Sequence, residues 1–213
     1  MISETHAKTI LTDKLNVSRE TFNDLEILVD LLKKWNKTIN LVGKSTVDQV
    51  WTRHILDSAQ MWQFRPQNLK TWVDLGSGGG FPALVLAILA KYDAPNAVFH
   101  MIESDARKSA FLRNVSRETF LRTKIHTCRI ENAEKIITDV ISARALSSVD
   151  RLFEYSQKYL SNSTYCLFLK GQSCATELEI ARESWGFQSE TTKSLSDGSG
   201  HILKAWNIRR ATK

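Results

Sequence analysis

The sequence predicts an α/β fold with a mostly parallel sheet of seven strands, an antiparallel terminal strand and an N-terminal helical extension. From residue 71 onward, short apolar runs alternate with longer amphipathic segments. A glycine-rich turn joins the first of these runs to an apolar helical segment. Before residue 70, apolar side chains recur three and four residues apart, which is typical of helices. We therefore expect an extension over residues 1–69 and a core over residues 70–213.

Two helices are predicted in the extension. Ser18 can cap the first through its hydroxyl, and the apolar face of this helix comprises Leu25, Leu28, Leu32, Trp35 and Ile39. The second covers Val47–Phe64 and ends before Pro66, because a residue that precedes proline disfavours the helical conformation. Arg53 and Asp57 lie four residues apart on this second helix. An exposed ion pair between them is one interpretation of that spacing.

The core is predicted as strands and helices in alternation. The expected strands are Thr71–Leu75, Ala97–Ile102, Thr123–Cys128, Asp139–Ala143, Thr164–Leu169, Trp185–Thr191 and His201–Ile208. A helix from about Asp105 to Phe120 follows the second strand. The last two strands are joined by Asp197-Gly198-Ser199-Gly200, a turn sequence that predicts antiparallel pairing.

The stretch Thr71–Pro82, T-W-V-D-L-G-S-G-G-G-F-P, predicts a ligand-binding turn. Four glycines in five residues would cost about 2–4 kcal/mol in regular structure, so a functional reason for them is expected. Pro82 is suited to the start of a helix. The order strand, turn, helix would bring a ligand against backbone N–H groups and the positive end of that helix. A flexible surface loop is the alternative.

Three ligand classes compete for such a turn. A phosphate-binding loop requires Gly-Lys-Ser/Thr, whereas Gly80 is followed by Phe81-Pro82. The dinucleotide pattern requires a third glycine where Phe81 stands. The remaining pattern, D-x-G-x-G-x-G, formed by Asp74, Gly76, Gly78 and Gly80, resembles the first motif of class I methyltransferases that use S-adenosylmethionine (SAM). In those enzymes the turn lies along the amino-acid end of the cofactor.

Further candidate residues follow the other predicted strands. Glu103 ends the second strand, where an acid can accept hydrogen bonds from both ribose hydroxyls; capping the next helix is its alternative role, with Ser104 as a competing cap. Ile130 and Glu131 follow the third strand and suit an adenine face and its exocyclic amine. Arg144 follows the fourth strand, at the edge of the sheet where open α/β folds bind ligands. Lys170 occupies the same edge.

The net charge of +6 suggests an anionic partner, such as nucleic acid. Basic residues gather within Lys33–Arg53, along Arg107–Arg129, and at Arg209, Arg210 and Lys213. A solvated helix face is the alternative explanation for each cluster taken alone.

The composition favours a cytoplasmic globular protein. No apolar run approaches the roughly 20 residues that a membrane-spanning helix needs, and Met1–Asn16 has no signal-peptide core. Cys128, Cys166 and Cys174 form no C-x-x-C pair, and the five histidines show no ligand spacing, so we expect no metal. The sequence is silent on oligomeric state, and a monomer is the default expectation.

Six segments together carry a family resemblance over nearly the whole chain. They are Trp35–Leu41 (WNKTINL), Arg53–Ser58 (RHILDS), Asp74–Pro82 (DLGSGGGFP), Glu103–Lys108 (ESDARK), Ser142–Leu146 (SARAL) and Leu169–Gly171 (LKG). This combination resembles the bacterial small-subunit ribosomal RNA methyltransferase G family, also called glucose-inhibited division protein B. The resemblance implies a class I SAM-dependent methyltransferase fold, which is Rossmann-like.

The resemblance also implies an activity: transfer of a methyl group from SAM to N7 of a guanine in 16S rRNA, the base G527. It implies that the cofactor site is lined by Gly76, Phe81, Ile130, Glu131 and Arg144, to which the residues above add Asp74, Gly78 and Glu103. Naked 16S rRNA and the 30S subunit both remain possible substrates. We expect Arg53, His54, Asp57 and Lys170 to border the substrate.

Methylation of N7 makes modest chemical demands. The N7 lone pair is unprotonated in neutral water, so the reaction requires alignment and no general base. We therefore predict that Arg144 orients the cofactor carboxylate or guanine O6. Two other classes of function stay open from the sequence: a methyltransferase that acts on protein or a small molecule, and a non-catalytic RNA-binding module.

Overall fold

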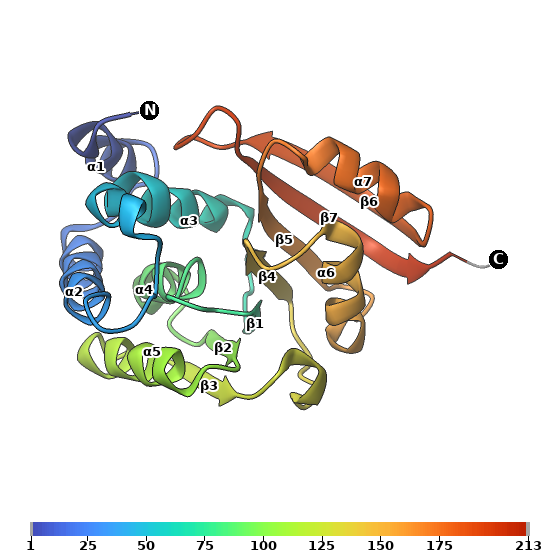
Figure 1. Cartoon of the computed structure of the whole chain (residues 1–213), viewed down its shortest axis with the longest axis horizontal. Coiled ribbons are helices and arrows are strands. Elements are labelled where there is room, and N and C mark those ends of the chain that lie inside the picture. The colour runs from blue at the N-terminus through green and yellow to red at the C-terminus, as the bar shows by residue number, and fades with distance from the viewer. Residues whose placement is uncertain (1, 212–213) are drawn as a thin grey trace.

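A single seven-stranded sheet forms the core of the computed structural model, which describes residues 2–211. The strands are β1 (Thr71–Leu75), β2 (Val98–Glu103), β3 (Thr123–Thr127), β4 (Val140–Arg144), β5 (Tyr165–Lys170), β6 (Trp185–Lys193) and β7 (His201–Arg210). Their order across the sheet is β3-β2-β1-β4-β5-β7-β6 (Figure 1). Met1 and Lys213, the latter part of the terminal basic cluster, lie outside the described residues.

The sheet has the predicted mixture of strand directions. Strands β1 to β5 pair in parallel, whereas β7 pairs antiparallel with both β5 and β6. The terminal hairpin therefore inserts its second strand between β5 and β6. The predicted fold class is confirmed, and the predicted bounds of the first five strands agree to within one residue at either end.

Helices cover both faces of the sheet. In Figure 1, one side carries α1 (Glu4–Asp13), α2 (Arg19–Trp35), α3 (Asp57–Ala59), α4 (Ala83–Asp93) and α5 (Ala106–Glu118). The other side carries α6 (Val149–Ser156) and α7 (Cys174–Arg182). Ser18 caps α2 as predicted, since its hydroxyl accepts a hydrogen bond from the Thr21 amide at 3.2 Å. No described helix is long and apolar enough to cross a membrane.

The two faces of the sheet bury two separate clusters because side chains alternate along each strand. Trp72 of β1 packs with the N-terminal helices and α4, whereas the next residue, Val73, packs with α6 and α7. On β5, Leu167 and Phe168 are divided between the clusters in the same way. Helices α1 and α2 contribute to the first cluster, so the extension and the core share buried apolar surface. The division at residue 69 stays a prediction.

The predicted helix over Val47–Phe64 is helical throughout but irregular. It comprises the 3-10 helix η1 (Lys44–Gln49), the π-helix η2 (Trp51–Leu56), α3 and the 3-10 helix η3 (Gln60–Phe64). Arg65 then adopts an extended conformation before Pro66, as predicted. Arg53 lies within the π-helical turn and Asp57 directly follows it, and this turn widens the usual spacing of 3.6 residues. They do not form the i, i+4 pair: Arg53 binds Asp197, and Asp57 binds Arg144.

The strand order reverses beside β1, which lies between β2 and β4. Ligands of open α/β sheets bind in the crevice outside the carboxyl ends of the strands at such a point. The glycine turn that follows β1 therefore lies where this fold binds its ligands.

Candidate active site

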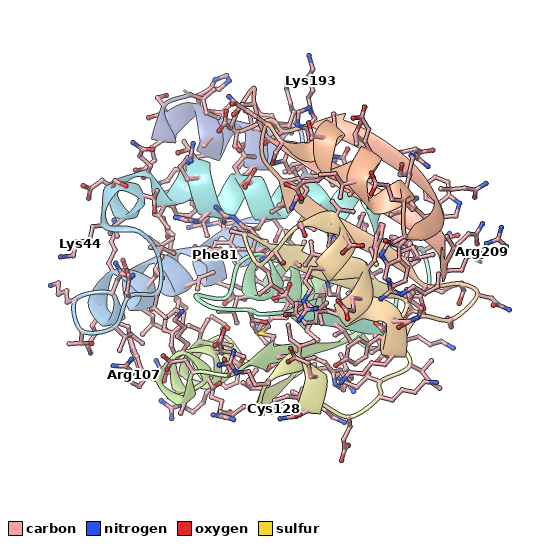
Figure 2. The ribbon with its side chains drawn as sticks, turned by 45° about the vertical axis from the view of Figure 1, so that its right-hand side comes forward. Lys44, Phe81, Arg107, Cys128, Lys193 and Arg209 are labelled. Atoms are coloured by element: carbon pink, nitrogen blue, oxygen red, sulfur yellow. The ribbon has the colours of Figure 1, made fainter. Side chains whose placement is uncertain are left out.

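A cavity of about 460 Å³ opens at the carboxyl ends of β1, β2 and β4. The glycine turn forms its floor with Gly76, Ser77, Gly78, Gly79 and Phe81. Glu103, Ile130, Glu131 and Arg144 line it from the neighbouring strand ends, as predicted, and His54 lines it from the extension. Both Phe81 and Cys128 line the cavity, and in Figure 2 Phe81 lies near the middle of the view with Cys128 below it.

The turn tolerates only glycine at several positions. Gly76 and Gly80 have φ of +65° and +87°, in the region that side chains disfavour. A Cβ on Gly76 would also lie 2.7 Å from the side chain of Leu146, and one on Gly79 would lie 2.8 Å from the carbonyl oxygen of Leu41. Gly78 has φ of +52°, but a Cβ there would meet only a backbone oxygen at 3.8 Å. Gly78 therefore presents its open side to space that a ligand can use.

Three amides of the turn are occupied by internal hydrogen bonds. Ser77 N donates to Ile102 O at 3.0 Å, Gly80 N donates to Ser77 O at 2.7 Å, and Gly78 N donates to the Glu103 carboxylate at 2.7 Å. The expectation of free N–H groups facing the ligand is wrong for these three residues. A cofactor would meet this part of the turn through carbonyl oxygens and Cα surfaces, which suits an ammonium group better than a phosphate.

Asp74 lies beneath the turn and is not among the residues that line the cavity. It is 1 % exposed, and its Oδ1 accepts a hydrogen bond from the Ser142 hydroxyl at 2.5 Å. The Trp72 indole donates to the same hydroxyl at 2.8 Å. Burial raises the pKa of Asp74 to about 7, although the bonds from Ser142 and Ser77 oppose the shift. Asp74 thus supports the turn from below.

Glu103 joins the turn to the start of α5. Besides the bond from Gly78, its Oε1 accepts from the Asp105 amide at 2.8 Å. Each carboxylate oxygen keeps a further lone pair, so Glu103 can still accept from ribose hydroxyls in the cavity. The alternative role as a helix cap is wrong, because Asp105 caps α5 by accepting from the amides of Arg107 and Lys108.

The residues after β3 form a second wall of the cavity. The short 3-10 helix η4 (Ile130–Asn132) places Ile130 and Glu131 at the cavity, as the sequence predicted. Ile130 is 9 % exposed, so an apolar face is available beside an exposed carboxylate.

Arg144 lies between the extension and the sheet. Its Nη2 donates to the carbonyl oxygen of Arg53 at 2.6 Å, and its Nε lies 3.7 Å from Asp57 Oδ2. Its Nη1 is buried without a partner in the described residues. Burial lowers the pKa of Arg144, but a guanidinium stays charged at neutral pH. The site therefore holds a cation with one nitrogen, Nη1, that has no hydrogen-bond partner among the described residues.

His54 is held as a neutral side chain. Its ring lies 4.9 Å from that of Phe81, and its Nε2 is 2.9 Å from the Thr46 hydroxyl. Burial, assisted by the charges of Arg144 and Arg53, lowers the pKa of His54 to about 3. A proton on this imidazole is therefore disfavoured throughout the neutral range.

A second cavity of about 230 Å³ adjoins the first, and Arg144 and Ala145 border both. It is lined by the other predicted substrate residues, Arg53, Asp57 and Lys170. Each has an internal partner: Arg53 lies 3.1 Å from Asp197, and Lys170 lies 2.5 Å from Glu177. The predicted site residues thus form two adjoining groups around one arginine.

The sequence reasoning missed several residues at the first cavity. Leu41 and Val42 line it from the extension, and Lys108 and Tyr155 line it from α5 and α6. The family resemblance already included Leu41 and Lys108, but nothing in their local spacing indicated a ligand. Leu146 was also missed as the side chain that packs against Gly76.

The site fits SAM on its own geometry. Open space lies beside Gly78, and Glu103, an apolar wall and Arg144 surround one cavity. Fold and site together define a SAM-dependent methyltransferase. Solved structures share this fold: a putative O-methyltransferase from Klebsiella pneumoniae gives a TM-score of 0.56 at 12% identity, covering 86% of this chain and 89% of that one. TYW2 from M. jannaschii, solved in complex with AdoMet, gives 0.54 at 12% identity, covering 82% and 80%.

Sequence comparison identifies the family. Residues 21–203 match the family described as rRNA small subunit methyltransferase G. A protein of that name from Cereibacter sphaeroides is 46% identical over 194 residues, which is 91% of this chain and 93% of the relative. Another from Parvibaculum lavamentivorans is 48% identical over 89% of this chain and 84% of its own length. The chain belongs to the rRNA small subunit methyltransferase G family and is a SAM-dependent RNA methyltransferase.

Proposed function

We propose that this enzyme methylates N7 of a guanine in 16S rRNA, the base G527 implied by the family resemblance, and that it acts as a monomer. One structural observation supports N7 as the acceptor. Among the described residues, the carboxylates bordering the second cavity, Asp57, Glu177 and Asp197, all accept internal hydrogen bonds. His201 also borders this cavity, whereas His54, which lines the first cavity, resists protonation. A hydroxyl or amine acceptor would need a base, whereas N7 needs none.

The first cavity is the proposed cofactor site. The carbonyl oxygens of the turn would accept from the ammonium group of SAM, and Glu103 would accept from the ribose hydroxyls. Ile130 would pack against the adenine ring, and Glu131 would accept from its exocyclic amine. When bound, SAM supplies an electrophilic methyl group on a sulfonium.

The second cavity is the proposed place of the guanine, with Arg144 between base and cofactor. The N7 lone pair would form the new N–C bond while the C–S bond breaks and sulfur keeps the electron pair. No proton moves in this step, and the purine gains a positive charge. Arg144 would donate from Nη1 to the cofactor carboxylate or to guanine O6, but leave N7 free.

The remaining predicted substrate residues surround the proposed guanine site. Asp57 accepts hydrogen bonds from Ser194 and Ser196, which tie the loop between β6 and β7 to the extension. It also accepts one from Gln60 within the extension. Lys170 also donates to the Ser147 carbonyl at 2.8 Å, which fixes the segment after β4. We therefore propose that Asp57 and Lys170 position the walls of the guanine site and that Arg53 borders the base, while His54, which lines the first cavity, meets the substrate from the cofactor side.

A labelled-methyl assay tests the proposal. SAM with a radiolabelled methyl group is offered to 16S rRNA, free and in 30S subunits, from a strain that lacks the enzyme, and the modified base is mapped. We expect label at N7 of a single guanine. Label at another atom, or transfer only to protein or small molecules, would contradict the proposed acceptor.

Arg144→Ala tests the proposed role of the arginine in the same assay. We expect turnover to fall by about 100-fold or more, because alignment of the reactants is lost. Arg151→Ala, which removes an exposed arginine from α6, is the matched control and should keep full activity. Near-normal methylation by the Arg144 variant, with an unchanged melting temperature, would refute the assignment.

A further inference from the structure

Lys158 makes an unusual set of contacts for a lysine outside the cavity. It lies on the 3-10 helix η5 (Gln157–Tyr159), which directly follows α6. Its ammonium donates to three backbone carbonyls of the neighbouring loop: those of Ile130 at 2.6 Å, Ala133 at 2.6 Å and Glu131 at 3.1 Å. An ammonium has three N–H groups. All three are therefore used on the single turn that contains η4.

The other contacts of this turn are local backbone bonds and apolar packing. The amides of Asn132 and Ala133 donate to Arg129 O at 3.0 and 3.1 Å, Ala133 also donates to Ile130 O at 3.3 Å, and the side chains of Ile130 and Ala133 are buried in the second cluster. The turn nevertheless lines the cofactor cavity. A charged donor that binds three carbonyls of one turn sets the orientation of its peptide groups, since charge-assisted hydrogen bonds are the stronger ones.

We propose that Lys158 is a positioning residue for the adenosine half of SAM. Lys158 is not among the residues that line the cavity, and it holds the η4 turn so that Ile130 and Glu131 present a formed surface before the cofactor arrives. This inference rests on the proposed placement of adenine at Ile130 and Glu131. The methionine half, which the glycine turn and Arg144 would bind, does not depend on Lys158.

Lys158→Met tests the proposal because methionine keeps an unbranched apolar side chain but has no donor. Dissociation constants are measured by calorimetry for SAM and for 5′-methylthioadenosine, which contains the adenosine half alone. We expect both constants to rise by about tenfold, roughly the equivalent of losing one charged hydrogen bond. The maximal rate at saturating SAM should change little, which separates positioning from catalysis.

Matched variants separate this role from loss of charge or of fold. Lys135→Met removes the same charge from an exposed position close to the turn and should leave both constants within about twofold. Lys158→Arg, which keeps the charge and two or more donors, should give intermediate affinity. A lower melting temperature with unchanged constants would overturn the proposal, as would weaker binding of SAM without weaker binding of methylthioadenosine.

Ile130→Ala distinguishes the two possible failures. If Ile130→Ala weakens methylthioadenosine binding but Lys158→Met does not, the role of Lys158 is refuted and the adenine site stands. If neither variant weakens it, both the adenine site and the role of Lys158 are refuted.

Discussion

At the scale of single residues, two buried polar side chains at the site have atoms without hydrogen-bond partners within the described part of the chain. Asp74 and Arg144 each have one buried atom without a partner in the described residues, Oδ2 and Nη1 respectively. Such atoms are rare because an unpaired buried polar group costs about 1–3 kcal/mol. Arg144 itself borders both cavities. For Asp74 the consequence is a raised pKa.

Asp74 makes stability depend on pH. Its pKa is about 7 in the folded protein and about 3.8 in an unfolded chain, so the folded state binds the proton more tightly. The stabilisation is fully present below the unfolded pKa and is lost as pH rises through the folded pKa. We therefore expect Asp74→Asn to match the parent near pH 3, below the unfolded pKa, and to be more stable by roughly 1–4 kcal/mol near pH 8.

Urea unfolding of the SAM-free protein across this pH range measures the effect. Asp13→Asn, at an exposed position of α1, is the control and should run parallel to the parent at every pH. If the difference between Asp74→Asn and the parent does not change with pH, the buried carboxyl is not protonated as argued.

At the scale of elements, the segment of the extension between α2 and η1 forms part of the cofactor cavity. Asn36 Oδ1 accepts hydrogen bonds from the amides of Leu41 and Val42 at 2.9 and 3.0 Å. These two residues line the cavity, and the Leu41 carbonyl packs closely against Gly79. One side chain thus fixes a backbone segment against the glycine turn.

Asn36→Ala should therefore weaken SAM binding as well as the fold. Two amides lose their acceptor, and we expect a loss of about 1–3 kcal/mol in unfolding free energy and about threefold to tenfold weaker SAM binding. Calorimetry and urea unfolding measure the two effects. Asn36→Asp keeps the acceptor and should stay close to the parent. Unchanged SAM affinity in Asn36→Ala would show that Leu41 and Val42 do not bound the occupied site.

The π-helical turn η2 determines which partners the neighbouring side chains reach. Because η2 interrupts the regular helix at Arg53 and His54, these two side chains and Asp57 reach different partners. Short π-helical turns are frequent at functional sites. Regular helical spacing predicted an exposed ion pair here, and that prediction was wrong for this reason.

At the scale of the whole molecule, exposed basic residues accompany the cavity. Lys108 and Arg129 line it, and the side chain of Arg107 on the same side is 74% exposed. Lys44 and Arg107 lie on one side of the view in Figure 2, whereas Arg209 lies on the other. Tyr165, the first residue of β5, pairs with Trp206 of the antiparallel strand β7. Arg209 therefore lies beyond the amino-terminal end of β5, at the edge of the sheet opposite the cavity. The basic side chains behind the net charge of +6 are thus unevenly placed: some lie near the cavity, where an RNA backbone could reach them, and others lie far from it.

Binding of 16S rRNA should weaken steeply with salt, because each neutralised phosphate releases counterions. We expect Arg107→Gln to reduce the slope of log Kd against log salt by about one. Arg209→Gln removes the same charge far from the cavity and should leave the slope unchanged. Filter binding over a salt series measures both. Equal effects of the two variants would place the RNA contact elsewhere, and a flat salt dependence would favour a non-RNA acceptor.

The sequence by itself determined the order of the strands, the glycine turn and part of the cavity wall, whereas helix α1 was not predicted. These features depend on local rules: apolar periodicity, the φ angles open to glycine, and the position of strand ends in a parallel sheet. For that reason Glu103, Ile130 and Arg144 were found at the cavity, as predicted.

Only the tertiary structure decided what these residues contact. The partners of Asp57 lie more than 130 positions away in Ser194 and Ser196, Asp74 supports the turn from beneath, and Lys158 reaches back to the loop after β3. Such contacts depend on how distant segments pack together. No spacing along one segment records which distant carbonyl or carboxylate will face a given side chain.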